Sequence, residues 1–284
     1  MSIAVVIPTF NRAHVISRAL DSVLRQTYAA DEIIVVDDGS NDGTVPLVTQ
    51  KYPDVNLIQL NKNHGVSHAR NCGINSAGSE WIALLDSDDE WQADKLAAQI
   101  KALKKEPECK ICHSDEIWIR NDRHLNQKKK HAKRGGWIFQ NCLPLCAISP
   151  SAAVIHRSVF EDVGVFDETL PACEDYDLWL RITAKYPVLF IPAPLVIKHG
   201  GHDDQLSKKH WGMDRFRIQA LEKAVNHGDL AEKDHTAALR MLVEKLNVIV
   251  QGAVKRNNET VQHCYGMKLS HYQRLLNNTS AKAL

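Results

Sequence analysis

An apolar run from Trp81 to Leu85 ends in three carboxylates within four residues, Asp86, Asp88 and Asp89. Continuous apolar runs are typical of strands that are buried on both faces of a parallel sheet, and ligands of such sheets bind outside the carboxyl ends of the strands. Three crowded carboxylates repel one another unless solvent or a cation compensates them, and Mg²⁺ and Mn²⁺ take oxygen ligands. The pattern predicts a buried strand that ends at a metal site. An acidic turn that caps the next helix is the alternative for this segment alone.

The composition narrows the class of protein. The 284 residues are enough for one large domain, or for a domain with an appendage. The 35 Lys and Arg residues balance the 34 Asp and Glu residues, so no nucleic-acid partner is expected. No stretch approaches the roughly 20 apolar residues that span a bilayer, and residues 1–8 lack the basic start of a secretion signal, so we expect a cytoplasmic protein.

The seven cysteines are an odd number in a chain without an export signal, which favours reduced thiols over a disulfide framework. Cys109 and Cys112 form a C-x-x-C pair in a strand-like run. Because the pair lacks a second Cys or His pair at metal-binding spacing, we expect core thiols rather than a zinc or redox site.

Strand and helix patterns alternate along the first 115 residues. Apolar runs predict strands, and residues 15–24 place an apolar stripe at the helical period. The expected strands are 3–7, 32–36, 55–60 and 81–85, and the expected helices follow the first three strands, the third of them over 66–76. This alternation implies a parallel sheet with helical crossovers, and therefore an α/β fold.

Polar residues follow each of these strands. The clusters are 9–12, 37–40, 61–64 and 86–89. Because the carboxyl ends of parallel strands meet at one edge of a sheet, we expect the clusters to meet there and to bind a ligand. Arg70, on the third helix, could reach a diphosphate at this edge with bidentate donors. The alternatives are an Asx-type turn for 37–40 and a solvated helix face for Arg70.

Four motifs stand in a fixed order. They read VVIPTFNR (5–12), VVDDGSNDGT (35–44), N-x-G-x-S-x-A-R-N-x-G (63–73) and LDSDD (85–89). In this order and spacing the chain resembles the family 2 glycosyltransferases over roughly residues 1–207. The resemblance implies a GT-A fold, in which a Rossmann-like, mostly parallel sheet is flanked by helices. It also implies an enzyme that transfers one sugar from a nucleotide-sugar with inversion at the anomeric carbon.

The resemblance implies a role for each motif. Thr9 and Asp38 match nucleobase positions, and Arg70 matches the arginine on the diphosphate side. Asp86 and Asp88 match a D-x-D pair that binds the ribose and the metal, on one side of an extended segment. The implied substrate-binding set is Pro8, Thr9, Asn11, Arg12, Asp38, Gly39, Asn63, Arg70 and Asp86, and Asp88 is the implied ligand of Mn²⁺ or Mg²⁺, with Asp89 as its substitute.

The residues also bear on the identity of the nucleotide. A carboxylate at Asp38 can accept a hydrogen bond from the imide N–H of uracil. A UDP-sugar is therefore the favoured donor, although the contact excludes no other base.

The segment 171–181 places three carboxylates near the start of an apolar helical stripe. Acidic residues at a helix start are also favoured by the helix dipole, which is the alternative here. The family's E-D motif falls on Glu174 and Asp175. The resemblance implies that Asp175 is the general base and that Glu174 orients the acceptor. Asp177 is expected to pair with Arg181 at i+4.

Residues 195–207 leave a strand and enter a Gly-Gly loop rich in His and Asp. Many relatives place a histidine shortly before a serine here, as a metal or diphosphate contact. His202 fits that position best and His199 is the runner-up. The chain has Lys198 and His199 where many relatives have an aromatic residue and an arginine. The basic segment 122–134 is expected to be a solvated loop, or a contact for an acidic glycan, a lipid diphosphate or a membrane surface.

The expected organisation is a glycosyltransferase domain over 1–207 and a helical extension over 208–284. The domain comprises a nucleotide-binding half, 1–115, and an acceptor and catalytic half, 116–207. Apolar stripes in the extension predict two or three helices. These helices pack on the core or on a second subunit, which makes a homodimer one expectation.

Together these features predict a metal-dependent, inverting glycosyltransferase. Its expected partners are a nucleotide-sugar donor and a glycan or lipid-linked acceptor, in the synthesis of a bacterial-type surface glycan, with peripheral contact at the inner face of the membrane as an option. A non-catalytic nucleotide-sugar-binding protein of the same fold is the alternative. Another nucleotide-binding α/β enzyme is disfavoured, because no G-x-G-x-x-G follows the first strand.

Overall fold

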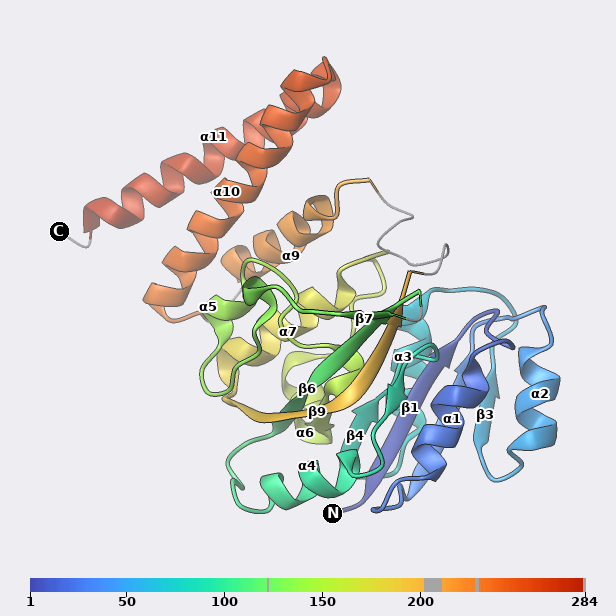
Figure 1. The fold of residues 1–284 in the computed structure, drawn as a ribbon. Coiled ribbons are helices and arrows are strands. Elements are labelled where there is room, and N and C mark those ends of the chain that lie inside the picture. Colours follow the sequence, from blue (N-terminus) through green and yellow to red (C-terminus); the bar gives the residue numbers. More distant parts are fainter. Residues whose placement is uncertain (122, 202–210, 228–229, 283–284) are drawn as a thin grey trace.

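A central sheet carries helices on both of its faces (Figure 1). The computed structural model describes residues 1–121, 123–201, 211–227 and 230–282. The strands in this part of the chain are β1 (Ile3–Thr9), β2 (Glu32–Asp37), β3 (Asn56–Gln59), β4 (Trp81–Leu84), β5 (Glu90–Trp91), β6 (Ile111–Arg120), β7 (Arg123–Leu125), β8 (Val154–His156) and β9 (Val188–Gly200). They are ordered β3-β2-β1-β4-β8-β6-β9-β5, with β7 paired to β6. The α/β class is confirmed.

The helices connect and cover these strands. They are α1 (Ile16–Leu24), α2 (Thr44–Lys51), α3 (Val66–Ser76), α4 (Lys95–Leu103), α5 (Phe139–Cys142), α6 (Arg157–Val163), α7 (Glu174–Lys185), α9 (Asp214–His227), α10 (Glu232–Lys255) and α11 (Glu259–Lys282). The predicted third helix, 66–76, has the same bounds as α3.

The first half of the sheet is parallel, as expected. β1 lies between β2 and β4, and β2 pairs with β3, all in parallel register. β1 runs on to Thr9, two residues beyond the expected end at residue 7. The pairing of β1 with β4 ends at Val6. The backbone of Pro8, two residues later, points to the same side as that of Val6, where β4 has already ended. Its missing N–H therefore removes no hydrogen bond from the sheet.

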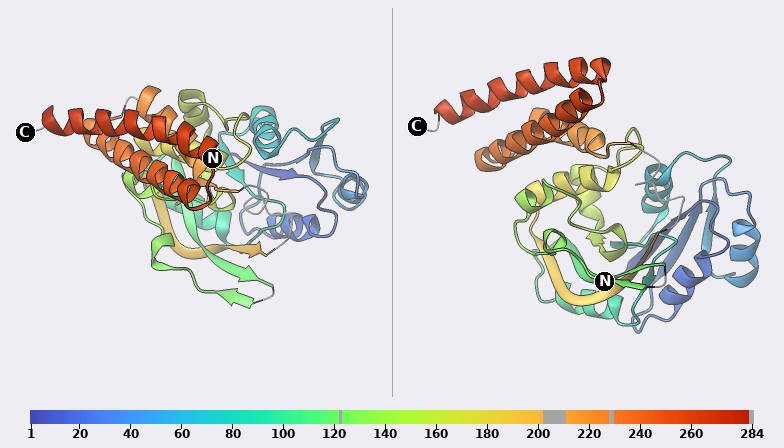
Figure 2. Two further views of the ribbon diagram at one scale, coloured as in Figure 1. Left: turned by 90° about the horizontal axis from the view of Figure 1, so that it is seen from above. Right: turned by 45° about the horizontal axis from the view of Figure 1, so that its top comes forward.

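The second half of the sheet is mixed. β8 runs antiparallel to both β4 and β6, whereas β6 and β9 are parallel over most of their length. β5 is antiparallel to β9. β6 and β7 form a hairpin that projects from the body of the molecule (Figure 2). The basic segment 122–134 is thus not simply a loop, because it contributes β7 and a 3₁₀ turn at Lys129–His131.

Alternate residues of each central strand face two separate hydrophobic layers. In β1, Ala4 and Val6 face a layer that contains α3, α6 and α7, and Ile3, Val5 and Ile7 face a layer that contains α1, α2 and α4. Because both faces are covered, the strand must be apolar at every position, which is why the pattern is continuous rather than alternating. Cys109 and Cys112 are buried in the second layer, as predicted for core thiols.

The C-terminal helices contribute buried residues to the first of these layers. α9 packs on α7, α10 packs on α9 and on α5, and α11 packs along α10. Both views show α10 and α11 side by side at the edge of the molecule (Figure 2). The division at residue 207 and the homodimer remain predictions. In the described ranges, none of the helices is long and apolar enough to cross a membrane.

Candidate active site

The loops that follow β1 and β2 are bonded to each other at the carboxyl edge of the sheet. The backbone N–H of Asn11 donates to Ser40 Oγ at 2.8 Å, and the N–H of Arg12 donates to Thr44 Oγ1 at 2.9 Å. Asn11 holds a left-handed backbone conformation, with φ 53°. The expected convergence of the first two polar clusters is therefore present.

The expected nucleobase residues lie at the ends of β1 and β2. The N–H of Asp38 donates to the carbonyl of Thr9 at 2.8 Å. Both oxygens of the buried Asp38 carboxylate already accept backbone N–H groups, from His64 and Gly65, at 2.8 Å each. Burial raises the pKa of Asp38, and the two N–H groups oppose this shift. Each oxygen keeps a second lone pair, so Asp38 can still accept from a base.

Gly39 brings the loop after β2 against the loop after β3. It has φ 77°, and a Cβ at this position would lie 2.7 Å from the backbone carbonyl carbon of Lys62. Only glycine permits both the conformation and the approach. The exposed Asn63 follows directly, so the third polar cluster also reaches this edge.

The acidic residues after β4 form a turn, and the extended segment expected for Asp86 and Asp88 is wrong. The N–H of Asp89 donates to the carbonyl of Asp86 at 3.0 Å. Ser151 holds both ends of the turn, because its Oγ accepts from the N–H of Asp86 at 3.1 Å and donates to Asp89 Oδ2 at 2.6 Å. Ser151, in the 3₁₀ turn that precedes β8, stabilises the turn form because it satisfies groups that an extended chain would leave unpaired.

The turn concentrates negative charge. Burial raises the pKa of Asp89 to about 8, and the charges of Asp88 and Asp86 act in the same direction against Lys198. Burial, followed by the neighbouring Asp86, raises the pKa of Asp88. Nearby cations, among them Arg12 and Lys198, lower the pKa of Asp88 but do not cancel its rise, so this half-buried carboxylate suits a hard cation such as Mn²⁺ or Mg²⁺.

The remaining candidate metal ligands are less complete. Among the described residues, no group of three or more His, Cys, Asp or Glu side chains could hold a metal ion. Any cation at Asp88 therefore needs further ligands from the substrate or from elsewhere. His199 lies in β9, where its N–H donates to Asp89 Oδ1 at 3.2 Å and its Nε2 lies 3.1 Å from Glu90 Oε1. His202 lies outside the described residues.

Lys198 is a half-buried cation, which the sequence showed only as a departure from the pattern of many relatives. Its Nζ donates to Ser149 Oγ at 2.9 Å. Asp89, Glu116 and Asp86 raise its pKa despite the cost of burial. The lysine stays protonated and offsets part of the charge of the acidic turn.

Arg70 connects the acidic turn with the start of α7. Its Nη2 donates to Asp86 Oδ1 and its Nη1 to Glu174 Oε1, each at 2.7 Å. Its side chain is 4% exposed, and its guanidinium lies 5.0 Å from the centre of the Phe166 ring. Arg70 is therefore neither on a solvated helix face nor presented to a diphosphate with free terminal nitrogens.

Glu174 and Asp175 begin α7, after Cys173 in a left-handed conformation with φ 61°. Asp175 Oδ1 accepts the N–H of Tyr176 at 2.7 Å, and Asp175 Oδ2 lies 3.0 Å from the sulfur of Cys146. Glu174 is buried and bound to Arg70. In these contacts the carboxylate of Glu174 is paired with a cation, whereas the carboxylate of Asp175 is not. Cys146 was not predicted, because only the folded chain brings it to α7.

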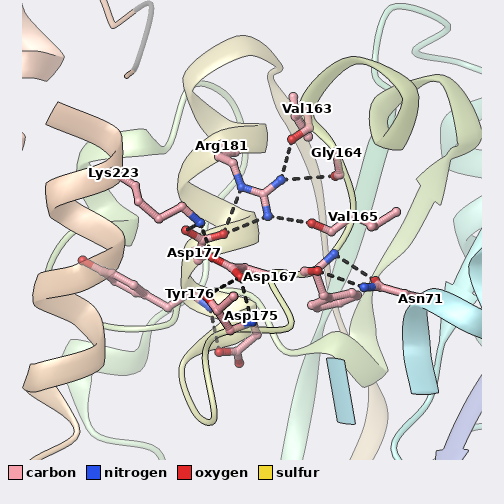
Figure 3. A network of polar contacts seen from close by, with 12 residues as sticks. Asn71, Val163, Gly164, Val165, Asp167, Asp175, Tyr176, Asp177, Arg181 and Lys223 are labelled. Atoms are coloured by element: carbon pink, nitrogen blue, oxygen red, sulfur yellow. Dashed lines mark hydrogen bonds and ion pairs between the residues drawn. The ribbon is translucent and has the colours of Figure 1, made fainter. Parts of the chain in front are cut away.

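A network behind the start of α7 fixes the position of this helix (Figure 3). Asp177 Oδ2 accepts from Arg181 Nη2 at 2.8 Å, so the predicted i+4 pair is confirmed. Lys223 on α9 binds Asp167 at 2.7 Å and Asp177 at 2.6 Å. Arg181 also donates to the carbonyls of Val163, the last residue of α6, and of Gly164 and Val165, which follow it.

The amino-acid sequence of this chain matches a known protein family. Residues 4–164 match the profile of glycosyl transferase family 2. The chain belongs to this family. An uncharacterized glycosyltransferase of Rickettsia felis is 30% identical to this family 2 chain over 218 residues, which are 73% of the chain and 35% of that relative. The chain thus spans about a third of the length of that relative.

Another relative of this family 2 chain has a specific name. The Escherichia coli protein WfgD, named UDP-Glc:alpha-D-GlcNAc-diphosphoundecaprenol beta-1,3-glucosyltransferase, is 32% identical over 182 residues, which are 63% of the chain and 69% of WfgD.

Solved structures support the GT-A fold of this family 2 chain. S. aureus TarS (residues 1–349), in complex with UDP-GlcNAc, aligns with TM-score 0.69 and 20% identity, over 87% of this chain and 72% of that one. The mannosyltransferase PcManGT from Pyrobaculum calidifontis, in complex with GDP-Man and Mn²⁺, aligns with TM-score 0.63 and 19% identity. The alignment covers 99% of this chain and 86% of PcManGT.

Proposed function

We propose that this chain transfers a sugar from a nucleotide-sugar, with a UDP-sugar favoured, to an acceptor hydroxyl with inversion. The observation that carries the proposal is the link through Arg70, which joins Asp86 of the acidic turn to Glu174 beside Asp175. A site for an activated donor and a candidate base thus lie on one connected set of contacts. The name of WfgD, which mentions UDP-Glc, and the complex of TarS with UDP-GlcNAc support the choice of donor.

The residues would divide the work as follows. Thr9, Asp38 and Gly39 would hold the nucleobase side of the donor. Asp88 would ligate Mn²⁺ or Mg²⁺, which would neutralise negative charge on the departing nucleoside diphosphate. The complex of PcManGT with Mn²⁺ supports a divalent cation in this fold.

Asp175 would act on the acceptor. Its carboxylate would take the proton from the acceptor hydroxyl while the oxygen attacks the anomeric carbon from the face opposite the diphosphate. This direction of attack inverts the configuration at that carbon. Glu174 is neutralised by Arg70, so it would orient the acceptor rather than take the proton.

The acceptor is proposed on more general grounds. WfgD is named for a lipid-linked diphosphate acceptor. We propose a glycan or lipid-linked acceptor and a role in surface glycan synthesis, in which the exposed cations of the β6–β7 hairpin, Arg120 and Arg123, would approach an acidic acceptor or a membrane surface.

Calorimetric titration of UDP, GDP and dTDP, each with and without Mn²⁺, tests the donor site. We expect one nucleotide to bind, and Mn²⁺ to tighten its binding in the parent and in Asp175→Asn but not in Asp88→Asn. Asp54→Asn, at an exposed site, is the control and should match the parent. An Asp88→Asn variant that keeps the full effect of Mn²⁺ would refute the metal assignment.

Release of UDP from a panel of UDP-sugars tests the chemistry, because water can replace the acceptor. Asp175→Asn should lower the rate by about 10²-fold or more, the usual contribution of a general base, while it still binds UDP. Nucleotide binding without turnover by the parent, over a panel of donors and acceptors, would instead support a non-catalytic nucleotide-sugar-binding protein.

A further inference from the structure

Cys146 places a thiol on the candidate base from a different segment of the chain. It lies between α5 and the 3₁₀ turn at Pro150–Ala152. Its Sγ is 3.0 Å from Asp175 Oδ2 and 3.1 Å from the carbonyl oxygen of Ile148. A thiol has one hydrogen, so it can donate to only one of these acceptors at full strength.

We infer that Cys146 is a positioning residue for Asp175, whose thiol donates to Oδ2 of the charged carboxylate and turns to the Ile148 carbonyl when Asp175 takes up a proton. The inference rests on the proposed role of Asp175 as the base. Oδ1 is bound by the N–H of Tyr176, so the two donors together fix the plane of the carboxylate.

The thiol is suited to this role because it stays protonated. Burial raises the pKa of Cys146 well above its ordinary value, and the charge of Asp175 acts in the same direction. The pair therefore consists of a neutral donor and a carboxylate, not of a thiolate and an acid. Hydrogen bonds to a charged acceptor are the stronger ones, so the thiol prefers Asp175 over Ile148 while the carboxylate is ionised.

The weakness of the donor matters as well. A sulfur–hydrogen group is a weaker donor than a hydroxyl, so it orients the carboxylate without strongly favouring its charged form. A serine at this position would donate more strongly and make the base weaker. An alanine would remove the hydrogen bond to Oδ2, which favours the charged carboxylate, and so make the base stronger.

The other groups around the pair come from several elements. Glu174 is next to Asp175 on α7 and is bound to Arg70. Lys198 of β9, Arg217 of α9 and the thiol of Cys142 on α5 lie near Cys146. None of these groups is changed by Cys146→Ser or Cys146→Ala, so a difference between the two variants reports on the donor itself.

Carbon NMR of ¹³C-labelled aspartate tests the inference without any substrate, with the Asp175 signal assigned by its loss in Asp175→Asn. We expect the titration midpoint of this signal to move down in Cys146→Ser and up in Cys146→Ala, each by about half a pH unit. Cys109→Ser and Cys109→Ala, at a buried thiol in the other hydrophobic layer, should leave it in place.

Midpoints that stay unchanged in both Cys146 variants, or that move in the same direction, would overturn the inference. A merely structural role would not produce opposite shifts. The proposed function is tested separately, because an Asp175→Asn variant that releases UDP at the parental rate would refute the base whatever the NMR result. A slow Asp175→Asn together with unmoved midpoints would refute the role of Cys146 alone.

Discussion

Asp86 and Glu174 share one guanidinium, that of Arg70, although they lie far apart in the sequence. Each carboxylate is 2.7 Å from its own nitrogen of the arginine, and the arginine is almost fully buried. The acidic turn after β4 and the first turn of α7 are thereby held at a fixed separation. The expected donor half and the expected acceptor half of the site are thus coupled through a single side chain.

Removal of this arginine should damage both stability and activity. Arg70→Ala leaves two carboxylates without their cation in a buried site, so we expect the free energy of unfolding to fall by about 3–5 kcal/mol. Arg70→Lys keeps the charge, but one ammonium group does not reproduce the fork of donors, so UDP release should fall at least tenfold. Urea unfolding and the UDP-release assay measure the two effects. Arg25→Lys, at an exposed site, is the control. An Arg70→Ala variant with the stability and the UDP-release rate of the parent would contradict the coupling.

Gly39 and Gly43 offer a matched pair of glycines in one loop. Both have positive φ, 77° and 91°, but only Gly39 has backbone atoms where a Cβ would lie. Gly43→Ala should therefore cost about 1 kcal/mol from backbone strain alone, and Gly39→Ala should cost more and also weaken nucleotide binding. Thermal unfolding and calorimetry give the two quantities. Equal losses in both variants would show that the approach of the Lys62 backbone is unimportant.

Lys95 should make stability depend on pH. It is fully buried, with its Nζ 2.7 Å from Gln99 Oε1 and 3.9 Å from the centre of the Trp91 ring. Burial lowers its pKa from 10.5 to about 7. Between these two values the unfolded chain binds more protons than the folded one, so stability rises as pH increases from 7 to 10.

Lys95→Met should remove this part of the pH dependence. We expect the parent to gain on the order of 2–4 kcal/mol of unfolding free energy between pH 7 and 10 from this group, and the variant to lack that gain and to be more stable at pH 7. Denaturant titrations at several pH values measure the unfolding free energy of the parent and of the variant. Lys101→Met, at an exposed position on the same helix, should keep the parental slope, and the same slope in Lys95→Met would contradict the assignment.

Asn71 holds the turn that precedes α7 through both ends of its amide. Its Oδ1 accepts the N–H of Phe166 at 3.0 Å, and its Nδ2 donates to the carbonyl of Phe166 at 2.9 Å and to Glu168 at 2.8 Å. Asn71→Asp has the same shape but sets a carboxylate against two acceptors, so we expect a loss of about 2–3 kcal/mol in urea unfolding. The exposed Asn75→Asp, one turn further along α3, should change stability by less than about 0.5 kcal/mol.

The first half of the fold was predictable because its signals are local. A strand buried on both faces needs an apolar residue at each position, and a helix on one face needs a stripe at its own period, so β4 and α3 are visible in short windows of sequence. The second half was harder. The antiparallel β8 is three residues long and pairs with segments far away in the sequence. A short apolar run does not specify its direction or its neighbours.

The sequence alone was sufficient for the family and for the α/β class, because each depends on residue type and spacing along the chain, whereas the roles of the site carboxylates stay predictions. The tertiary structure decided what these residues contact: Arg70 lies between Asp86 and Glu174, Cys146 contacts Asp175, and Lys198 lies near the acidic turn. Such pairings depend on how strands, helices and loops pack against one another. Burial then sets the strength of each charge, and burial exists only in the folded chain.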